Sequence, residues 1–379
     1  MTEFVELELT FSTKNNDKET ITVVVDKKIT VINRENLVGS LNCMSLKKIS
    51  GLENLVNLKS IVFNCESFTG LHDLEGIEKL DNLESVELGY NHTINSCQLM
   101  KNHGIIYHFK KLNFYESQTT NDDFLMYLPD LEELDLSYCN IGSNDFKIIH
   151  SKLKSLVLLE NDISNINFMH NYENLTKLVI YAGLIDVDCF NIIPHKNLEW
   201  LDISGTQTEK PVDFSVFNKF EKLKKLIFNG IFTSDYNYDN GDLCINCGKR
   251  CGYCNPIKKN NVSNNIFESM TLEYIDISNI IGLYIDDIRF GYFPNLKNLQ
   301  MSNNCIINLS FINDENFPCI TKLRIDKLVE NIGKKYIIDK IDSNTTFMEN
   351  MLLVTVNNDI PITSWQSSNY SPSNDWIIG

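Results

Sequence analysis

Four cysteines lie close together in the chain with a spacing that suits metal binding. They are Cys244, Cys247, Cys251 and Cys254, which form two Cys-x-x-Cys pairs separated by three residues. Two such pairs supply four thiolate ligands, the tetrahedral set that zinc prefers. We therefore expect one structural zinc ion, which would order a segment that has too little apolar content to fold alone.

The short spacer between the two pairs leaves other interpretations open. Zinc ribbons usually separate their Cys-x-x-Cys pairs by roughly fifteen residues or more. Unliganded or redox-labile thiols, an iron–sulfur cluster and disulfides are the alternatives. Gly248 and Gly252 permit tight turns, and Lys249 and Arg250 offset the negative charge of a zinc tetrathiolate. These neighbours favour the metal.

No comparable arrangement favours catalysis. The histidines form no His-Glu-x-x-His motif, and the chain lacks the GxSxG, GxGxxG and Walker phosphate-loop patterns. We therefore expect a protein that is not an enzyme. The seven histidines are His72, His92, His103, His108, His150, His170 and His195.

The cysteine segment interrupts a series of repeats. The most regular lines begin at Leu131, Leu153, Leu175 and Leu198, and their starts are 22, 22 and 23 residues apart. Each line has apolar residues at its positions 1, 4 and 6, which predicts a short strand with one buried face. One such strand cannot bury that face alone, so successive lines must stack to form a continuous core.

This LxxLxLxx(N/C)xL spacing resembles the leucine-rich repeat family, in its class of 22–26 residues per repeat. A short polar side chain at position 9 can bond the backbone of the neighbouring coil. The residues at this position are Cys139, Asn161, Gly183 and Thr206. The resemblance implies an α/β solenoid, a curved horseshoe with parallel strands on its concave face.

Lines before this region have a further feature. From Leu46 and from Leu71, apolar residues recur at every third position before the strand. This sequence pattern resembles the 22-residue class of leucine-rich repeats typified by protein phosphatase regulatory subunits. It predicts 3₁₀ or short helical returns on the convex side.

Eleven lines predict eleven coils. Their starts are residues 58, 83, 109, 131, 153, 175, 198, 223, 272, 296 and 320, and the one gap of 49 equals an ordinary repeat plus about 26 extra residues. We therefore divide the chain into an N-terminal β-hairpin cap (1–36), the solenoid (37–333) and a C-terminal cap and tail (334–379). An insertion at about 233–262 carries the four cysteines, and 352–356 is one more strand candidate.

The N-terminal segment predicts β-structure. Val5, Leu7, Leu9 and Phe11 alternate with polar residues, a turn follows at 14–17, and residues 19–25 and 29–32 are again rich in β-branched side chains. We expect a β-hairpin or small meander that covers the open end of the solenoid. A separate docking module is the alternative.

Charge and composition limit the setting. The net charge of −16 argues against binding to nucleic acid or to an anionic membrane. No stretch approaches the ~18 apolar residues of a membrane span, and the start, with Glu3 and Glu6, has no apolar core of a secretory signal. Eleven cysteines, an odd number, suit free thiols in an intracellular, cytoplasmic protein. The Asn, Ile and Lys bias is similar to that of leucine-rich proteins of amoebae or of giant viruses.

Positions 3, 5, 7 and 8 of each line point outward and line the concave surface. Exposed aromatic residues are typical of protein interfaces, although packing under a neighbouring coil is the alternative. The aromatic and acidic residues at these positions are Tyr90, Tyr115, Tyr138, Glu160, Tyr181, Trp200, Asp202, Tyr274 and Asp276. We expect them to bind a protein partner, which the acidic balance of the chain favours to be basic, and we expect a monomer.

These observations favour a non-enzymatic scaffold for protein–protein interaction. Two other classes stay open. One is a substrate adaptor of a ubiquitin ligase or a regulatory subunit of an enzyme. The other is a structural component of a particle or surface assembly.

Overall fold

The computed structural model describes most of the repeats and the N-terminal strands. The described residues are 4–12, 18–37, 46–63, 71, 73–89, 105–117, 121–181, 184–185, 190–208, 212–230, 232–233, 265–280, 288–301, 312–313, 315–324 and 352–353. The predicted insertion and almost all of the predicted C-terminal cap and tail lie outside them.

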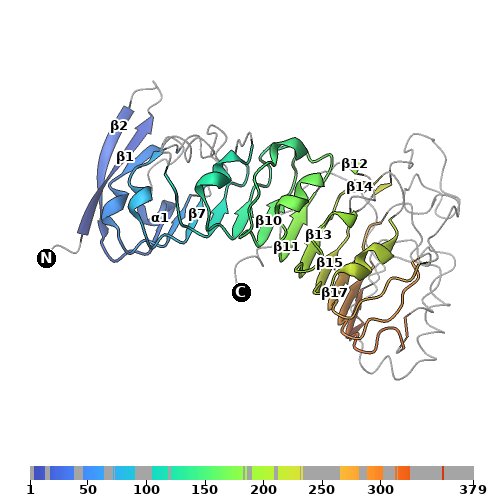
Figure 1. The fold of residues 1–379 in the computed structure, drawn as a ribbon. Coiled ribbons are helices and arrows are strands. Elements are labelled where there is room, and N and C mark those ends of the chain that lie inside the picture. The colour runs from blue at the N-terminus through green and yellow to red at the C-terminus, as the bar shows by residue number, and fades with distance from the viewer. Residues whose placement is uncertain are drawn as a thin grey trace, which may run out of the picture.

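Within these residues the chain forms an elongated stack of coils with one long parallel sheet (Figure 1). The sheet has 13 strands in sequence order, and neighbouring strands are parallel throughout. They are β3 (Val31–Asn33), β5 (Ser60–Val62), β7 (Ser85–Glu87), β8 (Lys111–Asn113), β9 (Glu133–Asp135), β10 (Ser155–Leu158), β11 (Lys177–Ile180), β13 (Trp200–Asp202), β15 (Lys225–Ile227), β17 (Tyr274–Asp276), β18 (Asn298–Gln300), β19 (Lys322–Arg324) and β20 (Leu352–Leu353).

Equivalent positions of successive repeats lie opposite one another in this sheet. Position 3 of each line pairs with position 3 of the next, from Ser60 to Lys322. The eleven predicted lines are therefore confirmed, because each supplies one strand at the expected place. Strands β15 and β17 pair directly, so the long gap between their lines adds no strand to this sheet.

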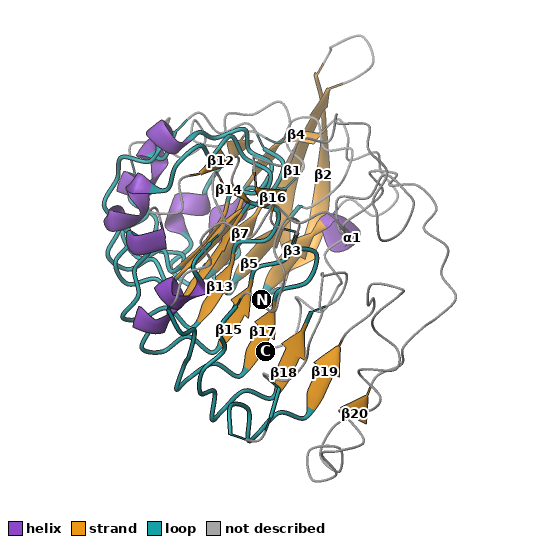
Figure 2. Ribbon diagram, turned by 90° about the vertical axis from the view of Figure 1, so that its right-hand side faces the viewer, coloured by secondary structure: helices purple, strands orange, loops and turns teal. Residues whose placement is uncertain are grey.

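The coils return through short 3₁₀ helices on the side opposite the sheet (Figure 2). They are η2 (Leu52–Asn54), η3 (Ile77–Lys79), η4 (Asp123–Tyr127), η5 (Ser143–Asp145), η6 (Asn167–Asn171) and η8 (Phe214–Lys219), and one short α-helix, α1 (Arg34–Leu37), follows β3. Gly51 and Gly76 begin η2 and η3 with φ of 89° and 92°, which a side chain at Cβ would oppose. The prediction of 3₁₀ returns is confirmed.

Two smaller sheets flank the returns. Strands β12 (Leu184–Ile185), β14 (Gln207–Thr208) and β16 (Phe232–Thr233) form a parallel three-stranded sheet. At the N-terminal end, the order is β2-β1-β4-β6, with β1 (Phe4–Ser12), β2 (Lys18–Asp26), β4 (Leu46–Ser50) and β6 (Asp73–Leu74).

The N-terminal hairpin forms as predicted, but its third strand does not. Strand β1 pairs antiparallel with both β2 and β4. The expected third strand, β3, instead pairs in parallel with β5 and becomes the first strand of the long sheet. The hairpin thus covers one side of the first coil while β3 begins the other.

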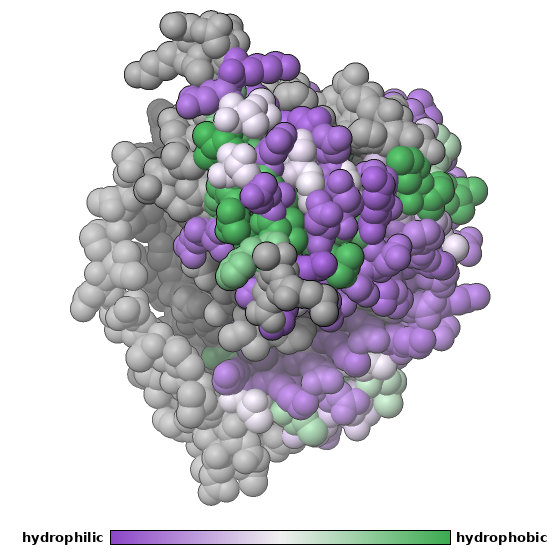
Figure 3. Space-filling view, turned by 90° about the vertical axis from the view of Figure 1, so that its left-hand side faces the viewer, coloured by the Kyte–Doolittle hydropathy of each residue, from purple (hydrophilic) through white to green (hydrophobic). Residues whose placement is uncertain are grey.

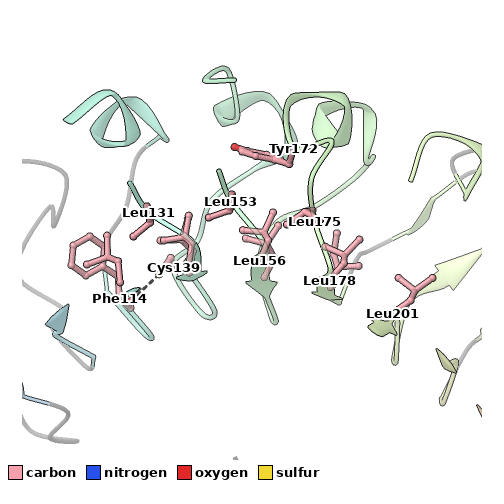
Figure 4. Close-up of a cluster of buried hydrophobic side chains, with 14 of the residues drawn as sticks. Phe114, Leu131, Cys139, Leu153, Leu156, Tyr172, Leu175, Leu178 and Leu201 are labelled. Atoms are coloured by element: carbon pink, nitrogen blue, oxygen red, sulfur yellow. Dashed lines mark hydrogen bonds between the residues drawn. The ribbon is translucent and has the colours of Figure 1, made fainter. Parts of the chain in front are cut away.

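The core follows the predicted apolar positions (Figure 4). The side chains at positions 1, 4 and 6 of the best-kept lines, such as Leu153, Leu156 and Leu158, are fully buried. Burying a leucine side chain stabilises the fold by about 1.5–3 kcal/mol. Each coil adds a similar layer, so the core extends along the stack rather than around one centre.

Phenylalanine rings continue this core past the predicted insertion. The rings of Phe214 and Phe267, which lie on either side of it in the sequence, are 5.6 Å apart between centroids. Asn218 donates from Nδ2 to the Ile266 carbonyl at 2.7 Å and accepts from the amide of Glu268 at 3.0 Å. The coils before and after the insertion therefore pack as direct neighbours.

Two of the position 9 residues, Asn161 and Cys139, bond between coils as the sequence predicts, and Gly183 lies outside the described residues. Asn161 accepts from the amides of Cys139 and Ile141 at 3.0 and 3.2 Å, and its Nδ2 donates to the Leu136 carbonyl at 2.8 Å. The Cys139 thiol donates to the Phe114 carbonyl at 3.0 Å. These bonds satisfy backbone groups where the chain turns away from the strand.

Position 2 carries a charge pattern that alternates between neighbouring coils. Lysine and glutamate pair across coils as Lys59–Glu84 (3.1 Å), Lys154–Glu132 (2.8 Å), Lys224–Glu199 (2.8 Å) and Lys297–Glu273 (2.7 Å). Exposed ion pairs of this kind contribute little to stability. Their alternation does disfavour pairing of a coil with its next-but-one neighbour, because that pairing would place like charges opposite each other.

A candidate interaction site on the concave face

Four side chains at position 3 form a continuous row on the concave face, which we call the lysine–aromatic row. It consists of Lys177, Trp200, Lys225 and Tyr274, which stand opposite one another on β11, β13, β15 and β17. The row is positioned by the alternation within each strand, because Leu178, Leu201, Leu226 and Ile275 point into the core beside it. All four side chains of the row are half-buried.

The two lysines approach the aromatic rings closely. The Nζ atoms of Lys177 and Lys225 lie 4.6 and 3.8 Å from the centre of the Trp200 ring, and Lys225 Nζ lies 5.1 Å from the Tyr274 ring. A cation–π contact contributes about 0.5–2 kcal/mol. Because the lysines come from the strands on either side of β13, they hold the indole between them.

Burial acts on both ammonium groups. Burial lowers the pKa of Lys177, whereas the nearby carboxylates of Glu133 and Asp135 raise it. It also lowers the pKa of Lys225, against the effect of Asp202 and Asp276. The row is thus a partly dehydrated pair of cations with carboxylates nearby, and a ligand that meets these cations need displace little water from them.

The neighbouring acids at position 5 have a structural task. Asp135, Asp202 and Asp276 accept from the backbone amides two residues later, at 2.8, 3.0 and 2.9 Å. Asn113 does the same for Tyr115 at 2.8 Å. Burial raises the pKa of Asp135 and of Asp202. These side chains turn the chain out of the strand, in the manner of an Asx turn.

The turn after the strand passes through the left-handed region at position 8, with or without an acceptor at position 5. Its φ values are 55° at Glu116, 57° at Tyr138, 52° at Glu160, 70° at Gly205, 69° at Gly230 and 56° at Asn279. A non-glycine residue in this region is uncommon. Its recurrence shows that the coil geometry, rather than the local residue, fixes the turn.

The predicted tyrosines at the strand ends contact neighbouring coils. Tyr115 and Tyr138 lie with their ring centres 5.2 Å apart, although Tyr138 is 41% exposed. The ring of Tyr181 covers Gly205 so closely that a Cβ there would lie 1.9 Å from it. Burial also raises the pKa of Tyr181. These side chains combine packing with partial exposure.

The predicted site residues therefore fall into two groups. Trp200, Asp202, Tyr274 and Asp276 lie together around the lysine–aromatic row. Tyr115, Tyr138, Glu160 and Tyr181 follow the ends of β8, β9, β10 and β11, and Tyr90 lies outside the described residues. The sequence prediction missed Lys177 and Lys225, although both occupy position 3 of lines that it had already identified.

The predicted metal ligands Cys244, Cys247, Cys251 and Cys254 also lie outside the described residues. In the part of the chain that the structure describes, three or more His, Cys, Asp or Glu side chains nowhere gather as a metal site.

Polar side chains elsewhere have structural partners. Asp122 is fully buried and accepts from the amides of Lys147 and Ile148 and from the Tyr172 hydroxyl, at 2.8, 2.8 and 3.2 Å. Burial raises the pKa of Asp122 and of Tyr172. His150 Nε2 lies 2.8 Å from the Leu128 carbonyl in the same region. These groups tie the returns of successive coils together.

A hollow of about 440 Å³ lies at the edge where the strands begin, and the row residues themselves do not line it. Its lining includes Glu132, Lys154 and Lys222. Lys154 pairs with Glu132 at 2.8 Å and Lys222 Nζ donates to Asn197 at 3.0 Å. Each of these three charged groups thus has a partner among the lining residues.

Comparison with known proteins supplies neither a family nor a curated relative, because no family model and no curated protein sequence matches the chain. None of the described helices has the length and apolar character needed to cross a membrane.

Several solved structures are similar in architecture. Internalin C2 of Listeria monocytogenes has 20% identity and a TM-score of 0.38, covering 52% of this chain and 81% of its own. Rad7 in its complex with Elc1 from yeast has 15% identity and a TM-score of 0.42, covering 82% and 85%. A leucine-rich repeat protein of Leptospira interrogans has 15% identity and a TM-score of 0.39, covering 82% and 90%. By its own register of strands and returns, the present chain has the architecture of a leucine-rich repeat solenoid.

Proposed function

We propose that this chain is a non-enzymatic scaffold that holds a protein partner on its concave face. The observation that carries the proposal is the lysine–aromatic row, in which Trp200 and Tyr274 alternate with two lysines in register on four strands. Tryptophan and tyrosine are among the side chains that contribute most to protein interfaces, and the flanking lysines are already partly dehydrated by burial.

The surroundings of the row suit a partner of mixed character. Val157 and Ile227 occupy position 5 on β10 and β15 and are half-buried, so apolar surface lies beside the lysines. The acids at position 5 are bonded to the backbone, as described above. The outward polar groups of the row itself are ammonium groups, and we infer that the partner presents carboxylates next to apolar side chains.

This inference differs from the one drawn from the whole chain. A net charge of −16 favours a basic partner at long range. At the row, contact is made with lysines, and short-range pairing decides which side chains fit there. A partner can satisfy both conditions if an acidic segment docks on the row and basic residues surround it.

The test begins with purification of partners from cells of the native host, followed by mass spectrometry. The identified partner is then bound to purified variants. Trp200→Ala and Tyr274→Ala are expected to weaken binding by about 1–3 kcal/mol each, as truncation of an interface anchor does. Binding is measured where every variant is folded, because the loss of the cation–π contacts lowers stability as well. Tyr292→Ala is the matched control, because Tyr292 is 45% exposed and precedes β18 outside the strand face.

Equal binding by all variants would contradict the use of the concave face. Lys225→Gln distinguishes the contribution of the ammonium charge to binding from that of the aromatic rings, since it removes the charge and keeps most of the side-chain length. If the partner is acidic at this point, this variant weakens binding and reduces its dependence on salt concentration.

The identity of the partner also distinguishes the remaining alternatives. Ubiquitin-ligase components or an enzyme subunit would indicate an adaptor or regulatory role. Co-purification in stoichiometric amounts with a particle or surface assembly would indicate a structural role.

The cysteine segment is proposed to bind one structural zinc ion, with Cys244, Cys247, Cys251 and Cys254 as ligands. Support comes from the chemistry of four thiolates in two Cys-x-x-Cys pairs. This zinc would order the insertion and has no part in the proposed interaction of the concave face.

A further inference from the structure

Strand β2 is the outer strand of the N-terminal sheet. It is nine residues long, and among the described residues its only strand neighbour is β1. The strands of the long parallel sheet have two to four residues each. The outer edge of β2 is therefore the longest unpaired backbone edge that the described part of the chain presents, at one end of the stack (Figure 1).

The middle of this edge lacks the features that usually block pairing, and the charged residues Lys18, Glu19 and Asp26 lie at its ends. Residues 20–25 are Thr20, Ile21, Thr22, Val23, Val24 and Val25, all uncharged and β-branched, without proline or glycine. The register with β1 runs without a bulge from Lys18 opposite Ser12 to Asp26 opposite Phe4. Natural proteins protect edges with charges, proline, bulges or short length, and an edge without them accepts an added strand.

The side chains on the edge leave apolar surface to cover. Ile21 and Val23 pack against the core from the inner face of the sheet but stay half-buried, and Val24 on the outer face is 62% exposed. Figure 3 views this end of the molecule, where apolar side chains lie among polar ones. An added strand would bury the flanks of Ile21 and Val23 and satisfy the backbone groups of the edge at once.

The sequence of β2 is complementary to itself. When two copies are placed antiparallel about Thr22, Lys18 lies opposite Asp26 of the second copy at both ends. Ile21 then lies opposite Val23 of the second copy on the inner face. Opposite charges and apolar β-branched pairs in directly facing positions both stabilise an antiparallel ladder.

We propose that two copies of this chain associate through antiparallel pairing of their β2 strands, which joins the two N-terminal sheets into one. The resulting dimer is symmetric, and each copy presents the same surface to the other. The concave face of each copy stays outside this contact, so the inference does not depend on the proposed function.

The experiment measures the mass of the full chain by sedimentation equilibrium over a range of concentrations. We expect a monomer–dimer equilibrium. Thr22→Lys is expected to weaken association by about fivefold or more, because two lysines would meet on the two-fold axis. Within one chain Thr22 is exposed and faces Glu8 on β1, so the new lysine gains an acidic neighbour and the hairpin stays folded.

Glu6→Gln is the matched control. It changes the charge by the same amount on β1, which lies inside the sheet, and should leave association unchanged. Thr22→Cys adds a direct test of the register, since mild oxidation should link two copies through residue 22, as mass spectrometry of the linked peptide would show. A wild-type chain that is monomeric at every concentration overturns the proposal, and so does a folded Thr22→Lys variant that associates like the wild type.

Discussion

Replacement of Asn161 by alanine should remove hydrogen bonds between two coils, while the buried apolar side chains still hold these coils together. Asn161 accepts from two backbone amides of the preceding coil, those of Cys139 and Ile141, and donates to the carbonyl of Leu136. A fourth bond, to the Leu159 carbonyl, matters less because that carbonyl also accepts from the amide of Tyr138 at 2.8 Å. Three backbone groups therefore lose this partner in the variant.

The magnitude follows from these three groups. A typical intramolecular hydrogen bond contributes about 1 kcal/mol net, and a buried group left unsatisfied costs about 1–3 kcal/mol. We expect Asn161→Ala to lower the free energy of unfolding by about 3 kcal/mol. Asn161→Asp keeps the acceptor for both amides and removes the donor to Leu136, so its effect should be smaller near neutral pH, apart from the cost of a partly buried charge.

Urea unfolding followed by circular dichroism measures the loss, and amide hydrogen exchange at Cys139 and Ile141 locates it. Asn165→Ala is the control, because Asn165 only accepts from the amide of Asn167, at 3.1 Å on the exposed surface. If Asn161→Ala costs no more than this control, or if exchange at Cys139 and Ile141 is unchanged, the role assigned to position 9 is wrong.

Two further predictions concern charge and metal. Burial raises the pKa of Asp135 above its unfolded value of about 3.9, so folding favours the protonated form, and this part of the stability is present at low pH and lost as pH rises through the folded pKa. Asp135→Asn keeps an acceptor for the Ser137 amide and should remove that loss. In urea unfolding at neutral pH the variant should be at least as stable as the wild type, and a less stable variant would contradict the prediction. Metal analysis should find about one zinc per chain. The zinc should be lost in the Cys247→Ser/Cys251→Ser variant and kept in Cys319→Ser, whose thiol is exposed and lies in another coil. A wild-type protein without metal would refute the site.

The repeat register was predictable because it depends on one strong term. Positions 1, 4 and 6 must be buried in every coil, and burial of large apolar side chains is the main stabilising contribution to folding. A line such as Leu223 to Phe228 therefore shows its place in the sequence without knowledge of its neighbours. Even the pairing of β15 with β17 followed, because both lines carried the pattern on either side of the insertion.

The path of the N-terminal strands was less predictable. Val31 and Ile32 of β3 are apolar and β-branched, which suits a strand whether it joins β2 in a meander or β5 in the long sheet. Local patterns of this kind identify a strand, but they do not select its neighbour. Among the described strands the outer edge of β2, where a meander would place β3, stays unpaired, and β3 instead continues the parallel ladder through β5.

The turns after the strands show a similar limit. Glycine at position 8 suggests a left-handed residue in the lines of Gly205 and Gly230, but Tyr138 and Glu160 give no such sign. The conformation at Tyr138 is supported by the acceptor Asp135 at position 5, whereas the line of Glu160 has Val157 there, so the stacking of coils fixes its turn. A residue that looks like a free surface anchor in the sequence can thus be held in place by its backbone.

The distribution of charge explains why the whole-chain balance is a poor guide to the site. Charges at position 2, such as Lys154 and Glu132, pair with one another across coils. Acids at position 5, such as Asp202, accept from the backbone of their own turn. At position 3, Lys111 and Glu133 pair across coils at 2.8 Å, whereas Lys177 and Lys225 flank the ring of Trp200. The same repeat position therefore holds chemically different residues, and the charges that the row presents are those of position 3 rather than the sum over the chain.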